Sequence, residues 1–129
     1  MHAPTSKYVI LLRIGFFGTA ALVAGLALFP YLTLPEPAIT RGFTDKIYHF
    51  VGCAVLVILA VEGWSQARRL AILALPLAFS LEWIQALVPG RGIHIADSIA
   101  NVAGVSIALI LLLGLGRLTP TSRDHDPAT

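Results

Sequence analysis

The sequence has 129 residues, of which 57% are hydrophobic and 12% are charged, and its formal net charge is +2. This length gives room for one domain, and the charged fraction is about half of the share usual in soluble proteins. A soluble core of this size could not bury so much apolar surface, so the composition indicates lipid as the surrounding solvent. The small, dispersed charge gives no reason to expect a nucleic-acid partner, and the single cysteine, Cys53, excludes an internal disulfide.

Four apolar runs follow one another, at about 14–34, 47–64, 70–88 and 96–115. Each approaches the roughly 20 residues that a helix needs to cross a bilayer. The first run ends at a Pro35-Glu36-Pro37 turn and is longer than a signal-peptide core, so we expect a retained anchor. Pro76 lies within the third run, where it removes a bond to the Ile72 carbonyl and predicts a kink.

The connections are short, at about 35–46, 65–69 and 89–95, which forces neighbouring helices to be antiparallel. The sequence therefore predicts an all-α membrane protein, an up-down bundle of four transmembrane helices. We expect one domain over residues 1–118 and a disordered cytoplasmic tail over 119–129, which is polar and carries two prolines.

Basic residues orient this bundle by the positive-inside rule. One side carries six of them and the other three: Lys7, Arg13, Arg68, Arg69, Arg117 and Arg123 against Arg41, Lys46 and Arg91. Both termini should then be cytoplasmic, in the cytoplasmic (inner) membrane of a cell envelope.

The strongly polar residues inside the apolar runs all fall near the opposite surface, toward the periplasm or cell exterior. They are His49 in the second run, Glu82 and Gln85 in the third, and Asp97 and Asn101 in the fourth. Ionisable residues inside a membrane are costly and usually mark a function or a specific pairing. The sequence thus predicts a polar layer at one end of the bundle.

Helical spacing groups these residues further. Asp45, His49 and Cys53 share one face, and Glu82 and Gln85 share another. Glu82 lies roughly 9 Å inside the third helix at 1.5 Å per residue, so it must face the bundle interior, pair with a base or be protonated. Its candidate partners are Lys46, Arg91 and His49, and a buried structural ion pair is the alternative to a functional site. For Asp45 and His49 the alternative is a helix-end acid and an interfacial histidine.

The fourth run carries a stripe at 4, 3, 4 spacing, polar at its outer end and small deeper down: Asp97, Asn101, Gly104 and Ala108. A similar stripe of small residues occurs in the first run at Gly18, Ala21 and Gly25. Small residues let membrane helices approach closely, so both stripes predict packing surfaces. Arg91, between two glycines, could bind a phosphate or carboxylate bidentately or contact lipid headgroups.

The sequence resembles the VanZ-like family of small membrane proteins. The match is carried by Asp45-Lys46, His49-Phe50, Glu82, Gln85, Arg91, Asp97, Asn101 and Gly104, over residues 44–113. His94 does not belong to the family pattern. The resemblance implies a location in the cell envelope and an association with resistance to teicoplanin-type glycopeptide antibiotics, but no defined reaction.

The polar layer is compatible with two functions. The first is a non-catalytic protein whose outward polar pocket binds an amphipathic envelope molecule or partner, such as a lipid-like molecule or an envelope precursor. Its ligand-binding residues would be Asp45, Lys46, His49, Glu82, Gln85, Arg91, Asp97 and Asn101. The second is a membrane-embedded enzyme acting on a lipid-linked or lipophilic substrate, with catalytic candidates His49, Glu82 and Asp97 and with His49 or Glu82 as acid-base.

Three further interpretations remain open: a metal site, a transporter and a purely structural bundle. His49, Glu82, His94 and Asp97 are acceptable metal ligands, but no close-spaced metal motif is present, so neither a metal nor another cofactor is expected. Four helices are few for a carrier, so transport would require an oligomer.

Overall fold

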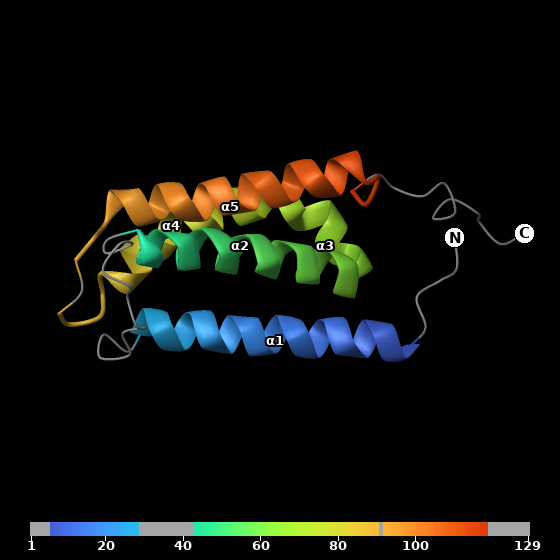
Figure 1. Ribbon diagram of the computed structural model, residues 1–129, viewed down its shortest axis with the longest axis horizontal. Coiled ribbons are helices and arrows are strands. Elements are labelled where there is room, and N and C mark those ends of the chain that lie inside the picture. Colours follow the sequence, from blue (N-terminus) through green and yellow to red (C-terminus); the bar gives the residue numbers. More distant parts are fainter. Residues whose placement is uncertain (1–5, 29–42, 91, 119–129) are drawn as a thin grey trace, which may run out of the picture.

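The computed structural model describes residues 6–28, 43–90 and 92–118. The helical elements are α1 (Ser6–Leu28), α2 (Thr44–Gly63), α3 (Ser65–Leu70), the 3₁₀ helix η2 (Ala71–Leu73), α4 (Ala74–Gln85) and α5 (Ile95–Gly114). Successive long helices run in opposite directions (Figure 1). The predicted all-α, up-down bundle of four helices is therefore confirmed. The predicted tail at 119–129 and the turn at 35–37 lie outside the described residues.

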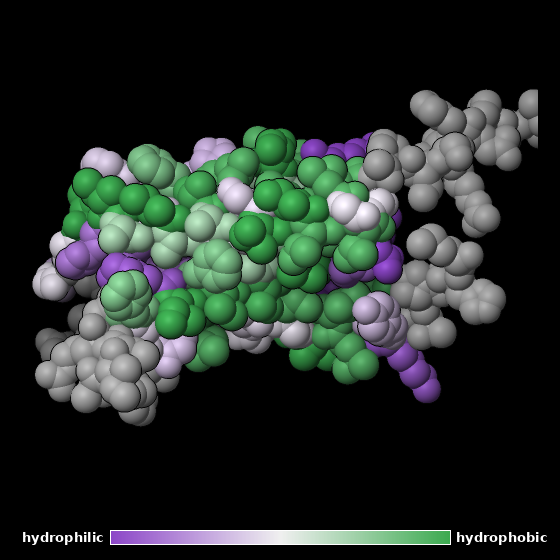
Figure 2. Space-filling model, turned by 45° about the horizontal axis from the view of Figure 1, so that its top comes forward, coloured by the Kyte–Doolittle hydropathy of each residue, from purple (hydrophilic) through white to green (hydrophobic). Residues whose placement is uncertain are grey.

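Three of these helices are long and apolar enough to cross a membrane: α1, α2 and α5. Large apolar side chains are exposed all along them, among them Phe17, Val51 and Ile110. Figure 2 shows hydrophobic residues over most of the length of one face, with hydrophilic residues gathered toward the two ends. This distribution matches an apolar belt between two aqueous surfaces.

The third helical crossing differs from the prediction, because its α-helix covers 74–85 rather than 70–88. The predicted loop at 65–69 is wrong: these residues form α3. No glycine or proline occurs between Gly63 and Pro76, so good helix formers continue the chain after the extended residue Trp64. Pro76 lies in the first turn of α4, directly after η2, where its missing N–H is tolerated. Pro76 therefore marks a helix start and not a mid-helix kink.

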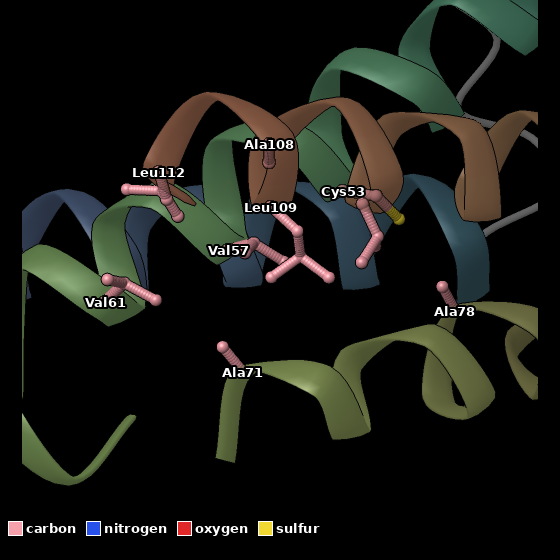
Figure 3. Close-up of a cluster of buried hydrophobic side chains, with 9 residues drawn as sticks. Cys53, Val57, Val61, Ala71, Ala78, Ala108, Leu109 and Leu112 are labelled. Atoms are coloured by element: carbon pink, nitrogen blue, oxygen red, sulfur yellow. The ribbon is translucent and has the colours of Figure 1, made fainter. Parts of the chain in front are cut away.

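α1 packs on α2, α2 on α5 and α5 on α4, and the chain neighbours α2 and α4 contact each other less than either contacts α5. The buried apolar core lies between α2, η2, α4 and α5, and Figure 3 shows Val57 and Leu109 close together, with Ala71 and Ala78 on the segment that faces them. Ala78 and Ala108 are buried at these contacts, which brings the backbones close together. Close packing of small residues, rather than exclusion of water, holds such helices together in lipid.

α1 begins at Ser6, eight residues before the predicted start, and it packs chiefly against α2. Its contacts include Leu59 over Gly15 and Val23 over Gly52. Within the described part of the chain, a Cβ at Gly18 or Gly25 would meet nothing within 4 Å, so these two residues of the predicted packing stripe do not contact another described helix. The hydrophobic pattern could not reveal this, since α1 is apolar on every side.

Arg13 joins α1 to the end of α2. Its Nε donates a hydrogen bond to the Gly63 carbonyl at 3.0 Å, and its guanidinium lies 5.1 Å from the Trp64 ring centroid. Carbonyls at a helix C-terminus lack helical partners, so an arginine there satisfies one of them. This contact explains how a charged residue is accommodated within α1.

We expect Arg13→Ala to lower the free energy of unfolding in detergent by about 1–2 kcal/mol, because a charge-assisted hydrogen bond and a cation–π contact are lost. The exposed Lys7 is the matched control, and Lys7→Ala should leave thermal unfolding unchanged. Equal stability of the two variants would contradict the role given to Arg13.

Candidate functional site

The polar residues singled out in the sequence meet at one end of the bundle. The first turns of α2 and α5 and the last turns of α4 lie side by side there, opposite the end that holds the start of α1 (Figure 1). Six of these residues form what we call the polar cluster: Asp45, Lys46, His49, Glu82, Asp97 and Asn101. The cluster joins three helices that are up to 52 residues apart in sequence.

His49 lies at the centre of the polar cluster. Its Nδ1 is 3.0 Å from Asn101 Oδ1 and 3.8 Å from Glu82 Oε1, and its Nε2 is 3.9 Å from Asp45 Oδ1. Asn101 is 0% exposed and Glu82 is 1% exposed, whereas the Asp45 side chain is 64% exposed. The imidazole therefore connects a buried acid and amide on one side with an exposed acid on the other.

The orientation of the Asn101 amide defines the tautomer of His49. The Cys53 thiol donates to Asn101 Oδ1 at 3.3 Å, and the same oxygen faces His49 Nδ1. A carboxamide oxygen can only accept hydrogen bonds, so Nδ1 carries the proton. In the neutral imidazole, Nε2 then keeps its lone pair, and this lone pair points toward the rim of the polar cluster.

Lys46 and Asp97 form a second pair across the helix interface. Lys46 Nζ is 3.6 Å from Asp97 Oδ1, with Lys46 partly exposed and the Asp97 side chain 5% exposed. Asp97 also lies in the first turn of α5, where a negative charge complements the helix dipole. The sequence left Lys46, Arg91 and His49 open as partners of Glu82. In the structure, His49 approaches Glu82, and Lys46 forms an ion pair with Asp97. Arg91 lies outside the described residues.

Three buried atoms of the polar cluster have no hydrogen-bond partner within the described part of the chain: Glu82 Oε1, Asp97 Oδ1 and Asn101 Nδ2. Leaving a buried polar group without a hydrogen bond costs roughly 1–3 kcal/mol. Most buried polar groups in proteins are satisfied, so several exceptions in one place require an explanation. The polar cluster is thus a costly arrangement that packing alone does not account for.

The other residues of interest lie around the polar cluster. Gln85 is buried one turn beyond Glu82 on α4. His94 precedes α5, its carbonyl accepts the first amide bonds of that helix, and its backbone hydrogen-bonds the Glu82 carboxyl group. Ser98 is only 2% exposed, and the sequence reasoning missed it. Its i, i+3 spacing to Asn101 was the available signal.

Asp45, His49 and Asp97 are the residues that could hold a metal ion, because one donor atom of each lies within 4.8 Å of the others. This set differs from the four ligands considered from sequence. In the search of the described residues, His94 and Glu82 do not belong to it.

An apolar helical bundle with an ionisable cluster inside one end defines a small integral membrane protein with an interior polar site. The comparison with protein families agrees: the model of the VanZ/LLP1 family matches residues 9–116. The chain therefore belongs to the VanZ/LLP1 family, and the match includes α1 as well as the helices that carry the polar cluster. No curated protein and no solved structure matched the chain.

Proposed function

We propose that this protein binds the polar head of an amphipathic molecule of the cell envelope in the polar cluster. The observation that carries the proposal is the trio of buried, unbonded atoms on Glu82, Asp97 and Asn101. They offer two acceptors and one donor, which suits a headgroup rich in hydroxyl or amide groups. The exposed apolar faces of the helices would hold the acyl chains of the same molecule.

α4 is the element that admits the headgroup. It is the shortest of the four main helices, it follows a 3₁₀ segment, and it packs on α5 while contributing Glu82 to the polar cluster. A small displacement of α4 would separate Glu82 from His49 and open the polar cluster to a ligand at the rim. Asp45 and Lys46, which are partly exposed, are the first residues that such a ligand meets.

We propose further that the polar cluster faces the periplasm or cell exterior and that both termini are cytoplasmic. Five described basic residues lie at the end opposite the polar cluster: Lys7, Arg13, Arg68, Arg69 and Arg117. Lys46 is the basic residue that the described chain places at the cluster end. This asymmetry follows the positive-inside rule and supports the orientation.

Labelling of single cysteines tests the orientation in a Cys53→Ala background. We expect Asp45→Cys to react with a membrane-impermeant maleimide in intact cells, because the Asp45 side chain is exposed. Ser65→Cys, also exposed but at the other end of α2, should react only after lysis. The reverse pattern would invert the proposed orientation. Cys53 itself is buried and should resist labelling in the unmodified protein.

The binding function is tested by susceptibility to a teicoplanin-type glycopeptide in a strain whose susceptibility changes when the protein is expressed. Replacement of His49, Glu82 or Asp97 by alanine should return susceptibility to the level of cells without the protein. Ser106→Ala is the control, since the Ser106 hydroxyl bonds only the Val102 carbonyl of its own helix. If all three variants accumulate in the membrane and still change susceptibility as the unmodified protein does, the polar cluster is not the binding site.

A membrane-embedded enzyme is the second candidate, favoured by the 3.8 Å approach of His49 to Glu82. A histidine beside a buried carboxylate is a common acid-base arrangement. Catalysis would alter the lipid composition of the host membrane, and Glu82→Gln would abolish that change. Identical lipid mass spectra of cells expressing the two forms would favour binding without reaction.

A further inference from the structure

We propose that Asp45, His49 and Asp97 bind one divalent transition-metal ion, such as Mn²⁺ or Zn²⁺, at the rim of the polar cluster. One carboxylate oxygen from each aspartate and one imidazole nitrogen lie within 4.8 Å of one another. Mixed carboxylate and imidazole donors suit these ions. Asp97 belongs to both proposed sites, but the metal site is argued from the positions of the three donor atoms and does not require headgroup binding.

The helices arrange the three donors without a sequence motif. Asp45 and His49 are four residues apart on α2, so their side chains project from one face. Asp97 comes from the first turn of α5, the helix against which α2 chiefly packs. Only the packing of α5 on α2 brings the third donor to the first two, so the metal motifs sought in the sequence could not reveal the site.

His49 already has the form that a metal ligand requires. Its Nδ1–H donates to Asn101 Oδ1, which leaves the Nε2 lone pair directed toward Asp45. Metal-binding histidines almost always donate the other ring N–H to a carboxylate or carbonyl, which fixes the ring and raises its basicity. Asn101 therefore has the role of an orienting residue behind His49.

The spacing of the donors is close to that of a bound ion. Bonds of about 2.0–2.2 Å place two donors on opposite sides of an ion roughly 4 Å apart. The His49 Nε2 to Asp45 Oδ1 distance of 3.9 Å is already within this limit. The Asp45 side chain is 64% exposed and can turn toward an ion. Three protein donors leave coordination positions open for water or for an oxygen of a ligand.

The charges of the polar cluster favour a cation. Its described residues comprise three carboxylates, on Asp45, Glu82 and Asp97, against the single ammonium of Lys46. Acids in first turns also complement helix dipoles, which explains the presence of Asp45 and Asp97 at these positions. Dipoles do not explain why the buried Asp97 Oδ1, 3.6 Å from Lys46 Nζ, has no hydrogen-bond partner among the described residues. A metal ion bound by Asp97 would supply that partner.

Titration of the purified, chelator-treated protein with Mn²⁺, followed by electron paramagnetic resonance of the free ion, tests the site. We expect one ion per chain, displaced by Zn²⁺. Asp45→Asn should weaken binding at least about tenfold, because a first ligand is lost. Asp45 is exposed, so this variant should fold, as circular dichroism will verify. Glu62→Gln, which removes a carboxylate at the opposite end of α2, should bind as the unmodified protein does.

Lys46→Met should have the opposite effect on Mn²⁺ binding from Asp45→Asn. Its ammonium lies 3.6 Å from Asp97 Oδ1, so it repels an ion held by that oxygen. Removal of this charge should tighten Mn²⁺ binding about tenfold. The site is refuted if the unmodified protein binds less than one ion per chain, if Asp45→Asn and Glu62→Gln bind alike, or if Lys46→Met fails to tighten binding.

Discussion

Gly104→Ala is expected to destabilise the bundle more than any other single methyl group added to its helices. A Cβ at this position would overlap the carbonyl oxygen of Phe50 and lie 2.9 Å from its carbonyl carbon. These are backbone atoms of α2, so no side chain can turn away to make room. We expect the free energy of unfolding in detergent to fall by about 1–3 kcal/mol, the usual range for overpacking. Thermal unfolding of the purified protein measures the effect.

The matched controls are Gly18→Ala and Gly25→Ala. Both glycines lie in α1, and a Cβ at either would meet no described residue within 4 Å. Because alanine also favours helix over glycine, these two variants should be as stable as the unmodified protein or slightly more so. If Gly104→Ala unfolds together with the two controls, α5 does not approach α2 as closely as the structure indicates.

The contact at Gly104 also positions the candidate site. Phe50 follows His49 on α2, and Gly104 lies one turn after Asn101 on α5. The close approach of the two backbones therefore fixes the height of α5 against α2, which places Asn101 Oδ1 3.0 Å from His49 Nδ1. A lateral shift of α5 would break this hydrogen bond before it disturbed the apolar core. Gly104→Ala should accordingly weaken Mn²⁺ binding as well as stability.

Hydrophobic length and loop length were sufficient to predict the bundle and the end at which the polar residues meet. The start and end of α5 lie within one residue of the predicted range, because Asp97 and the apolar run after it define that helix clearly. Antiparallel helices with short loops must bring His49, Glu82 and Asn101 to the same end. That part of the candidate site follows from sequence position alone.

The pairing of residues within the site could not be predicted in this way. It depends on α5 packing against both α2 and α4, an arrangement that hydrophobic patterns do not contain when most faces of the helices are apolar. The helical state of 65–70 was also missed, because a short polar stretch between two apolar runs usually forms a loop. Cys53 was placed on the His49 face, but its bond to Asn101 became evident only from the packing.

Glu82→Gln should separate stability from function. The change keeps the volume of the side chain and replaces a carboxyl group that is 1% exposed and has one oxygen without a hydrogen-bond partner among the described residues. A buried carboxyl group with an unbonded oxygen is unfavourable, so the variant should be as stable as the unmodified protein or more stable, by up to about 2 kcal/mol. In a strain that responds to the protein, the proposed change in glycopeptide susceptibility should nevertheless be lost, since the proposed headgroup site would lack its innermost acceptor.

The reverse substitution one turn along α4 completes the experiment. Gln85 is buried on the same face of α4, and Gln85→Glu adds a second carboxylate beside Glu82. We expect it to lower stability by about 2–3 kcal/mol, because two like charges then share a buried site. Should Glu82→Gln instead be the less stable of the two variants, the carboxylate is a structural partner of His49. The interaction with His49 would then offset the cost of burying Glu82, and no ligand would be needed to explain the polar cluster.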